Sequence, residues 1–126
     1  MVTAKDVLER AMQLCGYVNR EGVPDRLRDA DIYKRGLAMV NQIFSDMFFA
    51  EIPEGEFHPL RGMGEAIPLS ARCVNDCMPY GVAMLLAGAE GDAANQRMFS
   101  LAYNQKRAGG VKAKGRIADK FPTGEW

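Results

Sequence analysis

The sequence predicts a mainly α-helical protein: a small bundle of four to five helices with a short β-hairpin-like loop and an extended C-terminal arm. Three observations lead to this prediction. Apolar residues recur at helical spacing through residues 33–47, residues 82–87 are apolar nearly all round, and residues 50–70 contain prolines and glycines that exclude a regular helix. With 126 residues, the chain fits one domain and can bury an adequate core.

Residues 79–107 are predicted to form two helices that meet at the tight polar corner Glu90-Gly91-Asp92. The first is apolar on several sides, so it should be the central helix of the bundle. Asp92 can cap the second, in which one face should pack and the other face solvent. The predicted packed face is Ala94, Met98, Leu101, Ala102 and Gln105, and the predicted solvent face is Asn95, Arg97, Ser100 and Asn104. This hairpin carries more apolar surface than two helices can bury.

A further helix is predicted between Thr3 and Gly16. Thr3 can act as its N-cap, with Asp6 at the reciprocal position of a capping box. Gly16 stands where a left-handed C-cap residue belongs, so the helix should end near Cys15. Residues 19–29 combine glycine, proline and mixed charges without a helical period, which predicts a loop.

An amphipathic helix follows, opening at Asp29 or Asp31 and fading at the Phe48-Phe49 pair. Its apolar face repeats every three or four residues. That face is Tyr33, Leu37, Val40, Phe44 and Met47. Because the period is sustained through the whole segment, this is the clearest amphipathic helix in the chain.

Residues 50–70 are predicted to form a protruding loop, which suits a contact surface. Segments 56–60 and 65–69 could pair across a turn at residues 62–64, although a proline in each permits only a small, edge-like hairpin. Ser70 can then cap a short helix over residues 71–77. Pro79 either kinks one long helix or begins a new one that Asp76 caps.

The last part of the chain is predicted to be a separate arm, which divides the protein into a helical domain, residues 1–107, and a flexible arm, residues 108–126. The arm is rich in glycine and poor in apolar residues, so it cannot form a packed core alone. It nevertheless carries the adhesive side chains Ile117, Phe121 and Trp126. Since an exposed Trp is costly unless it lands on a partner, we expect the arm to become ordered on assembly.

Charge and hydropathy limit the classes of partner. Sixteen basic and sixteen acidic residues cancel, so no strong field indicates a nucleic acid, an anionic membrane or an acidic substrate. The N-terminal residues scatter charges through a helical repeat, unlike a signal or transit peptide. No apolar run approaches the roughly 18 residues of a membrane span. We therefore expect a soluble protein with protein partners and no membrane contact.

Four side chains could be imagined as a zinc site. Cys73 and Cys77 are four residues apart, and Cys15 and His58 could complete the set. Zinc motifs of this kind usually bring two close-spaced pairs, which this chain lacks. Buried reduced thiols that act as small apolar residues are the favoured interpretation.

Catalytic patterns are equally weak. His58 is the single histidine, so any nucleophile pair would have to use it. The glycines of residues 62–64 match neither phosphate-binding loop. Glu51, Glu54 and Glu56 cluster on a loop with no burial to separate their pKa values, as paired acid–base catalysis requires. We predict no catalytic residue, no metal and no cofactor.

The order of features carries a family resemblance. The first helix ends in LCG at residues 14–16, the second bears Asn41 and Phe44, and the loop ends in IPL at residues 67–69. MPYGVA follows at residues 78–83, then the EGD corner, a helix with Tyr103, and RIADKFP at residues 116–122. This order resembles the head–tail connector, or head-completion adaptor, proteins of tailed bacteriophages and prophages.

The resemblance implies a structural protein that assembles as a homo-oligomeric ring between the portal and the tail or stopper proteins, with no catalysis. DNA would pass through the ring lumen without sequence-specific binding. The protein would occupy the bacterial host cytoplasm during assembly and the head–tail junction in the virion. Implied partner contacts lie in the loop and in the arm. They are Phe57, Leu60, Met63, Ile67, Ile117, Asp119, Phe121 and Pro122, to which the exposed-Trp argument adds Trp126.

Two other functions stay open at this point. A small helical DNA-binding regulatory protein would use the lysines and arginine of the arm, with Phe121, to follow a phosphate backbone through weak, salt-sensitive contacts. A small enzyme would need a concave pocket that holds His58 together with a cysteine or a carboxylate. The ring subunit is the favoured hypothesis.

Overall fold

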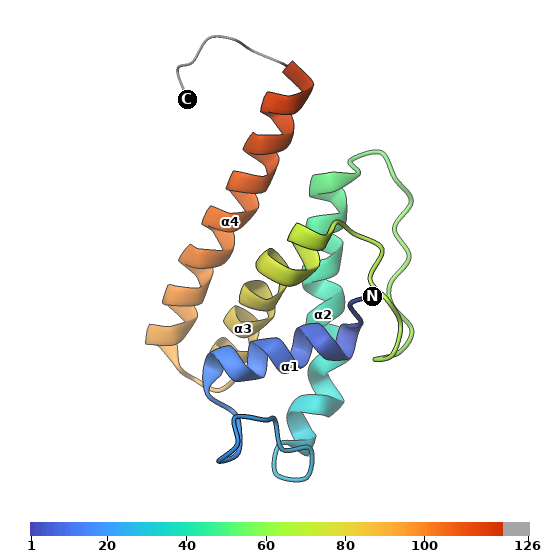
Figure 1. The fold of residues 1–126 in the computed structure, drawn as a ribbon. Helices are drawn as coiled ribbons and strands as arrows, with labels where there is room; N and C mark the ends of the chain where they lie inside the picture. Colours follow the sequence, from blue (N-terminus) through green and yellow to red (C-terminus); the bar gives the residue numbers. More distant parts are fainter. Residues whose placement is uncertain (120–126) are drawn as a thin grey trace.

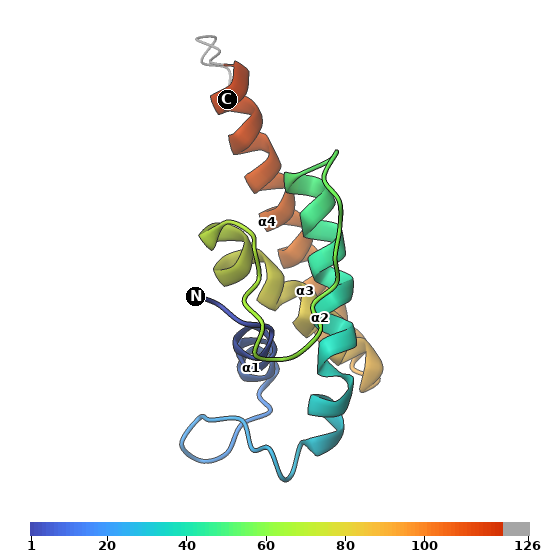
Figure 2. The same ribbon diagram turned by 90° about the vertical axis from the view of Figure 1, so that its right-hand side faces the viewer.

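Four α-helices and one π-helical segment make up the fold (Figures 1 and 2). The computed structural model describes residues 1–119, and their side chains as far as Gly109. The elements are α1 (Ala4–Cys15), α2 (Ala30–Glu51), η1 (Cys73–Cys77), α3 (Met78–Ala89) and α4 (Ala93–Asp119). The described residues contain no strand, and a single isolated bridge joins Thr3 to Ala66. The prediction of a mainly α-helical bundle is confirmed.

Helix α3 is the central helix, as its sequence predicts, and it contacts α1, α2, η1 and α4. Val82, Ala83 and Leu86 are fully buried on it. Gly81 marks the tightest approach, because a Cβ atom there would lie 2.8 Å from Ile43 Cγ2 and 2.9 Å from Tyr103 Cε1. The missing side chain therefore lets α2 and α4 both close onto α3.

The segment before α3 resolves the two alternatives at Pro79. Ser70 Oγ accepts a hydrogen bond from the Cys73 amide at 3.2 Å, so Ser70 caps this segment as predicted. Residues 71–89 then form one continuous helix with a π-helical stretch in which the Met78 amide donates to the Cys73 carbonyl. A widened turn of this kind accommodates Pro79, which has no amide hydrogen to donate.

The caps predicted for α1 are confirmed. The Thr3 hydroxyl accepts from the Asp6 amide at 3.2 Å and the Asp6 carboxylate accepts from the Thr3 amide at 3.0 Å, which is a complete capping box. Gly16 ends the helix with φ 84°, a left-handed conformation that favours glycine. In α2, Asp29 occupies the N-cap position without a side-chain cap, and the helix ends two residues beyond the Phe48-Phe49 pair.

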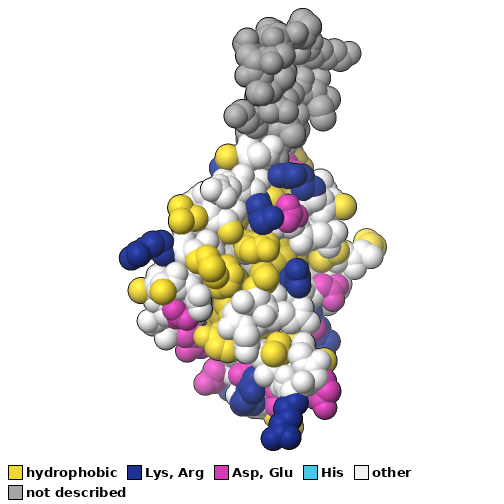
Figure 3. Space-filling view, turned by 60° about the vertical axis from the view of Figure 1, so that its left-hand side comes forward, with side chains coloured by type: hydrophobic (Ala, Val, Ile, Leu, Met, Phe, Trp, Pro, Cys, Tyr) yellow, Lys and Arg dark blue, Asp and Glu magenta, His cyan; other side chains and the backbone are white. Residues whose placement is uncertain are grey.

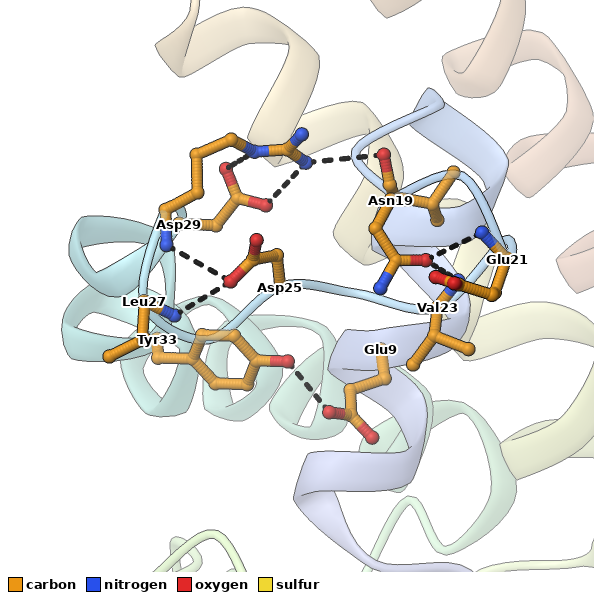
Figure 4. A network of polar contacts seen from close by, with 10 residues as sticks. Glu9, Asn19, Glu21, Val23, Asp25, Leu27, Asp29 and Tyr33 are labelled. Carbon is orange, nitrogen blue, oxygen red and sulfur yellow. Dashed lines mark hydrogen bonds and ion pairs between the residues drawn. The ribbon is translucent and has the colours of Figure 1, made fainter.

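The connection from α1 to α2 is a loop, as predicted, and its own polar side chains order it (Figure 4). The Asn19 side-chain oxygen accepts from the amides of Glu21 and Val23 at 2.9 and 3.1 Å. The Asp25 side-chain oxygen accepts from the amides of Leu27 and Arg28 at 3.0 and 3.2 Å. Such turns replace backbone hydrogen bonds, so this loop holds a defined shape without a packed core of its own.

Residues 52–70 do not form the predicted hairpin. Their carbonyl groups instead satisfy the start of α1, where the Ala4 amide donates to the Glu65 carbonyl at 3.1 Å and the Lys5 amide to the Met63 carbonyl at 2.8 Å. The first amides of a helix have no partner within the helix, so they compete for these carbonyls. Pro59 lacks the amide that a strand ladder would need, which removes the competing arrangement.

The C-terminal segment also differs from the prediction, because α4 continues as a helix to Asp119 where an extended arm was expected. Glycine at positions 109 and 110 disfavours a helix by about 1 kcal/mol each, but extending a helix that packing has already nucleated costs little. In Figures 1 and 2 the last turns of α4 project beyond the other helices. The flexibility expected for residues 108–126 stays a prediction.

Replacing Gly81 by Ala tests the close approach at α3. We expect Gly81→Ala to lower the free energy of unfolding by about 1–2 kcal/mol, because overpacking against Ile43 and Tyr103 outweighs the gain in helix propensity. Gly88→Ala in the same helix is the matched control, since its Cβ would meet only the flexible end of the Gln96 side chain. Urea denaturation should show Gly88→Ala unchanged or more stable. Equal effects of the two substitutions would contradict the proposed constraint.

Candidate interaction surface

Helix α4 packs on the bundle through a different face from the predicted one. Among the side chains of α4 that the structure describes, Phe99 and Tyr103 are buried, at 3% and 4% exposure. The centre of the Phe99 ring lies 6.3 Å from that of the Tyr80 ring of α3. Met98 and Leu101, which were expected to pack, point outward instead. Both faces of the helix carry apolar residues. The two aromatic rings have the larger apolar area to bury, so they take the inner position.

The neighbouring positions shift in the same sense. Ala94 and Gln105, predicted to pack, are exposed, and Ala102 is half-buried. Asn95 and Ser100, predicted to face solvent, are half-buried, whereas Arg97 and Asn104 are exposed as predicted. The buried stripe is thus displaced by one residue, which corresponds to a rotation of about 100° around the helix axis.

Met98 and Leu101 are 52% and 60% exposed on the outward face of α4. Beside Leu101, α3 and α4 border a shallow hollow of about 320 Å³. The hollow is lined by Met84, Ala93, Gln96, Arg97, Ser100 and Leu101. Figure 3 shows hydrophobic side chains gathered on this side of the molecule. Apolar side chains grouped at the surface in this way are typical of a contact site. We call Met84, Arg97, Met98 and Leu101 the α4 face.

A group of polar contacts, which we call the polar anchor, fixes the middle of α4 to α2 and η1. The Asp46 carboxylate of α2 accepts hydrogen bonds from the Tyr103 hydroxyl and from Arg107, whose Nε lies 2.8 Å from Asp46 Oδ2. Lys106 Nζ lies 2.8 Å from Asp76 Oδ1 of η1. These pairs could not be predicted from the sequence, because their partners are far apart in the chain and carry no local motif.

The anchor also sets protonation states. Burial, followed by the hydrogen bond to Asp46, raises the pKa of the Tyr103 hydroxyl above its ordinary value of 10.0, which extends to higher pH the range in which this hydroxyl can donate a hydrogen bond to Asp46. The hydrogen bond to Asp76 raises the pKa of Lys106, whose ammonium also lies 4.8 Å from the centre of the Tyr80 ring. These contacts fix the position of α4 along its axis and its rotation about that axis.

The C-terminal end of α2 exposes a second pair of apolar side chains. Phe49 is 46% exposed and Ile52 is 42% exposed. The Phe49 ring packs edge-on against Phe48, with 5.3 Å between ring centres, so it is held in place although nearly half of it meets solvent. Glu54 and Glu56 follow, and both are exposed. We call Phe49, Ile52, Glu54 and Glu56 the α2 end.

Loop residues that the resemblance implied as partner contacts are largely used within this chain. Leu60 and Ile67 are buried, at 4% and 6% exposure, so in this structure neither is available to a partner. Phe57 and Met63 are half-buried and pack against the core. They lie inward because the loop follows the bundle instead of protruding as a hairpin.

Asn41 holds the loop, a role that the sequence analysis did not assign. Its side-chain amide donates to the Leu60 carbonyl at 3.0 Å, and its side-chain oxygen accepts from the Leu60 amide at 2.7 Å. At the far end of the loop, the half-buried Glu51 accepts from the Ser70 hydroxyl at 2.6 Å, which ties the end of the loop to α2. The sequence offered one signal for this role: the side-chain amide of Asn41 stands next to the apolar face of α2, where a polar group needs a hydrogen-bond partner.

The implied arm residues lie at the limit of the structure. Ile117 and Asp119 fall in the last turns of α4, where only the backbone is described. Phe121, Pro122 and Trp126 lie outside the described residues. Their contacts therefore stay predictions.

The side chains considered for metal or nucleophile chemistry are not brought together. Cys73 and Cys77 are buried in η1, and burial raises the pKa of both thiols. Cys15 donates to the Ala83 carbonyl, and burial raises its pKa to about 11. His58 is exposed on the loop. Among the described residues, no group of three or more His, Cys, Asp or Glu side chains is placed to hold a metal ion.

Comparisons with known proteins leave the family open. No family model matches the chain, and neither the curated proteins nor the solved structures gave a significant match. Within the described part of the chain, no helix is long and apolar enough to cross a membrane.

Removing Asp46 tests the polar anchor. The Asp46 side chain is 44% exposed, so its ion pair with Arg107 contributes little. The expected cost of Asp46→Ala, about 1–3 kcal/mol in the free energy of unfolding, comes mainly from the buried Tyr103 hydroxyl left without a partner. Tyr103→Phe should relieve part of that cost in the double variant, and urea denaturation of the four proteins measures this coupling. Fully additive costs would show that the two side chains act independently.

The thiols make stability depend on alkaline pH. Burial raises the pKa of Cys73 above its ordinary value of 9.0, so above about pH 9 the unfolded chain loses a proton that the folded chain keeps. Stability should therefore fall with pH, with a limiting slope of about 1.4 kcal/mol per pH unit for each thiol. In Cys73→Ala the decline of the unfolding free energy between pH 8 and 10, measured under reducing conditions, should be shallower. Parallel declines in both proteins would contradict this role.

Proposed function

We propose that this chain is a structural subunit of a phage-type head–tail connector, which assembles as a ring between the portal and the tail or stopper proteins. The observation that supports this most directly is the α4 face, where Met98 and Leu101 stay more than half exposed on a helix that buries Phe99 and Tyr103 against the bundle. A subunit that is completed by its neighbours would leave such a face uncovered when alone.

The shape of α4 is a second support. The polar anchor holds this helix at residues 103–107, and its last turns continue beyond the other helices (Figure 1). A helix held firmly at its middle can present its far end to a second protein with little loss of conformational freedom. In the proposed assembly this end, with Ile117 and Asp119, meets the portal or a neighbouring subunit.

The proposal gives DNA a passive part. Neutral net charge supplies no general attraction to a phosphate backbone, so DNA would pass through the lumen without sequence-specific binding. No described contact favours the DNA-binding regulator over the ring subunit. That alternative is therefore an outcome of the test below.

The test is binding to phage heads that carry the cognate portal. Full-length protein should co-sediment with portal-bearing heads, and a chain that ends after Gly109 should lose this binding because it lacks the projecting end of α4. Circular dichroism and urea denaturation serve as the fold control. The truncation keeps the whole polar anchor, so the body should unfold cooperatively at nearly the same urea concentration.

Two outcomes would contradict the proposal. Binding to heads that lack the portal as strongly as to portal-bearing heads would remove the connector function. A strictly monomeric protein that ignores heads and binds duplex DNA, with affinity falling steeply as salt rises, would favour the regulator.

A further inference from the structure

Two separate regions of the surface each expose a pair of large apolar side chains three residues apart. On the α4 face these are Met98 and Leu101, and on the α2 end they are Phe49 and Ile52. The α4 face borders a hollow of about 320 Å³. The α2 end lies where α2 stops, with Ile52 as its C-cap residue, and the chain then leaves the helix as a loop (Figure 1). The α4 face therefore offers a hollow that an apolar side chain can enter, and the α2 end offers two exposed apolar side chains.

The two regions carry opposite charges. Arg97 lines the hollow, and among the described residues it has no ion-pair partner. At the α2 end, Glu54 also lacks a partner within the described chain, and Glu56 has only the exposed His58, with 3.6 Å between Nε2 and Oε1. An apolar pair beside the cation Arg97 thus matches an apolar pair beside the carboxylate Glu54.

The helix ends add to this complementarity. Ala93, the first residue of α4, lines the hollow, and the first turn of this helix contains no acidic residue. The α2 end lies at the C-terminus of α2, whose last turn contains no basic residue. The first carries partial positive charge from the free backbone amides and the second partial negative charge from the free carbonyls. Asp92 offsets part of the positive end, since it caps the Asn95 amide at 3.1 Å.

The two regions are too far apart to meet within one chain. Helices α2 and α4 run in the same direction, so the end of α2 and the start of α4 lie at opposite ends of the bundle (Figures 1 and 2). A contact between them needs a second copy. Because different surfaces meet, a growing complex always keeps one unused α4 face at one end and one unused α2 end at the other. Addition then continues until a ring closes, provided that the rotation between neighbouring copies permits closure.

We propose that copies of this chain associate head to tail, with Phe49 and Ile52 of one copy seated in the hollow of the α4 face of the next, and with Glu54 opposite Arg97. This deepens the proposed ring function, on which it rests, by naming the two surfaces that join neighbouring subunits. The contact uses only described residues of the bundle and needs neither the portal nor residues 110–126.

A mixing experiment separates this arrangement from a symmetric one. Wild-type protein should form oligomers larger than dimers as concentration rises, measured by light scattering and sedimentation. Leu101→Glu places a charge on the α4 face and Ile52→Lys places one on the α2 end, so each substitution should prevent its surface from joining another copy. Each variant alone should therefore be monomeric. A 1:1 mixture should form heterodimers and stop there, because each variant keeps one working surface. Leu27→Glu is the matched control, since Leu27 is 92% exposed on the α1–α2 loop, and it should assemble as wild type does.

Charge reversal tests the predicted pairing of side chains. Arg97→Glu and Glu54→Lys should each weaken self-association, by roughly tenfold or more for a desolvated pair. The double variant should recover most of the loss, since the pair is then reversed and not broken. Lys34→Glu makes the same charge change as Arg97→Glu on the solvent side of α2 and should have little effect.

The outcomes distinguish this inference from the ring function itself. Oligomers that form equally well in Leu101→Glu and Ile52→Lys overturn the inference but leave a ring built through other surfaces. Loss of assembly in Leu101→Glu but not in Ile52→Lys points to a symmetric contact and also overturns it. A wild-type monomer at every concentration overturns it as well, and the head-binding test then decides the connector function independently.

Discussion

The packing of three helices around one missing side chain is the constraint on which the rest of this structure depends. At Gly81, Ile43 of α2 and Tyr103 of α4 approach to 2.8 and 2.9 Å from the position that a Cβ atom would take, which is too close for a side chain to fit without a shift. Their approach brings the Tyr103 ring into the core and its hydroxyl to Asp46. A larger residue would separate these helices, and the hydrogen bond that fixes α4 would then lose its geometry.

The rotation of α4 about its own axis follows from that contact. Once Phe99 and Tyr103 face inward, Met98 and Leu101 must face outward, because neighbouring residues on a helix point about 100° apart. The polar anchor then holds this rotation through Arg107 and Lys106. The surface that we propose as an interface is therefore a direct consequence of core packing, and the same contacts that stabilise the fold define it.

Several local features could be predicted because their causes are local. The capping box of Thr3 and Asp6, the left-handed Gly16 and the Asp92 cap each involve residues within three or four positions of one another. The central position of α3 could also be predicted, because a helix that is apolar on all sides has no stable place at the surface. The prediction of a hairpin over residues 56–69 was wrong because the contacts that decide this segment are not local. Its carbonyls accept hydrogen bonds from the first amides of α1, which are distant in sequence.

The sequence by itself determined the approximate limits of α1 and α2 and the central position of α3, since periodicity and caps are properties of neighbouring residues. Whether Pro79 begins a new helix or lies within one long helix was left to the tertiary structure. Tertiary structure alone decided which face of α4 is buried, that Asn41 holds Leu60, and that Asp46 binds Tyr103 and Arg107. Helix α4 has apolar residues on two faces, so its own periodicity allows either face to pack. The space beside Gly81 of α3 and the carboxylate of Asp46 of α2 favour the face that carries Tyr103. Both features belong to other helices, so the sequence of α4 alone does not reveal them.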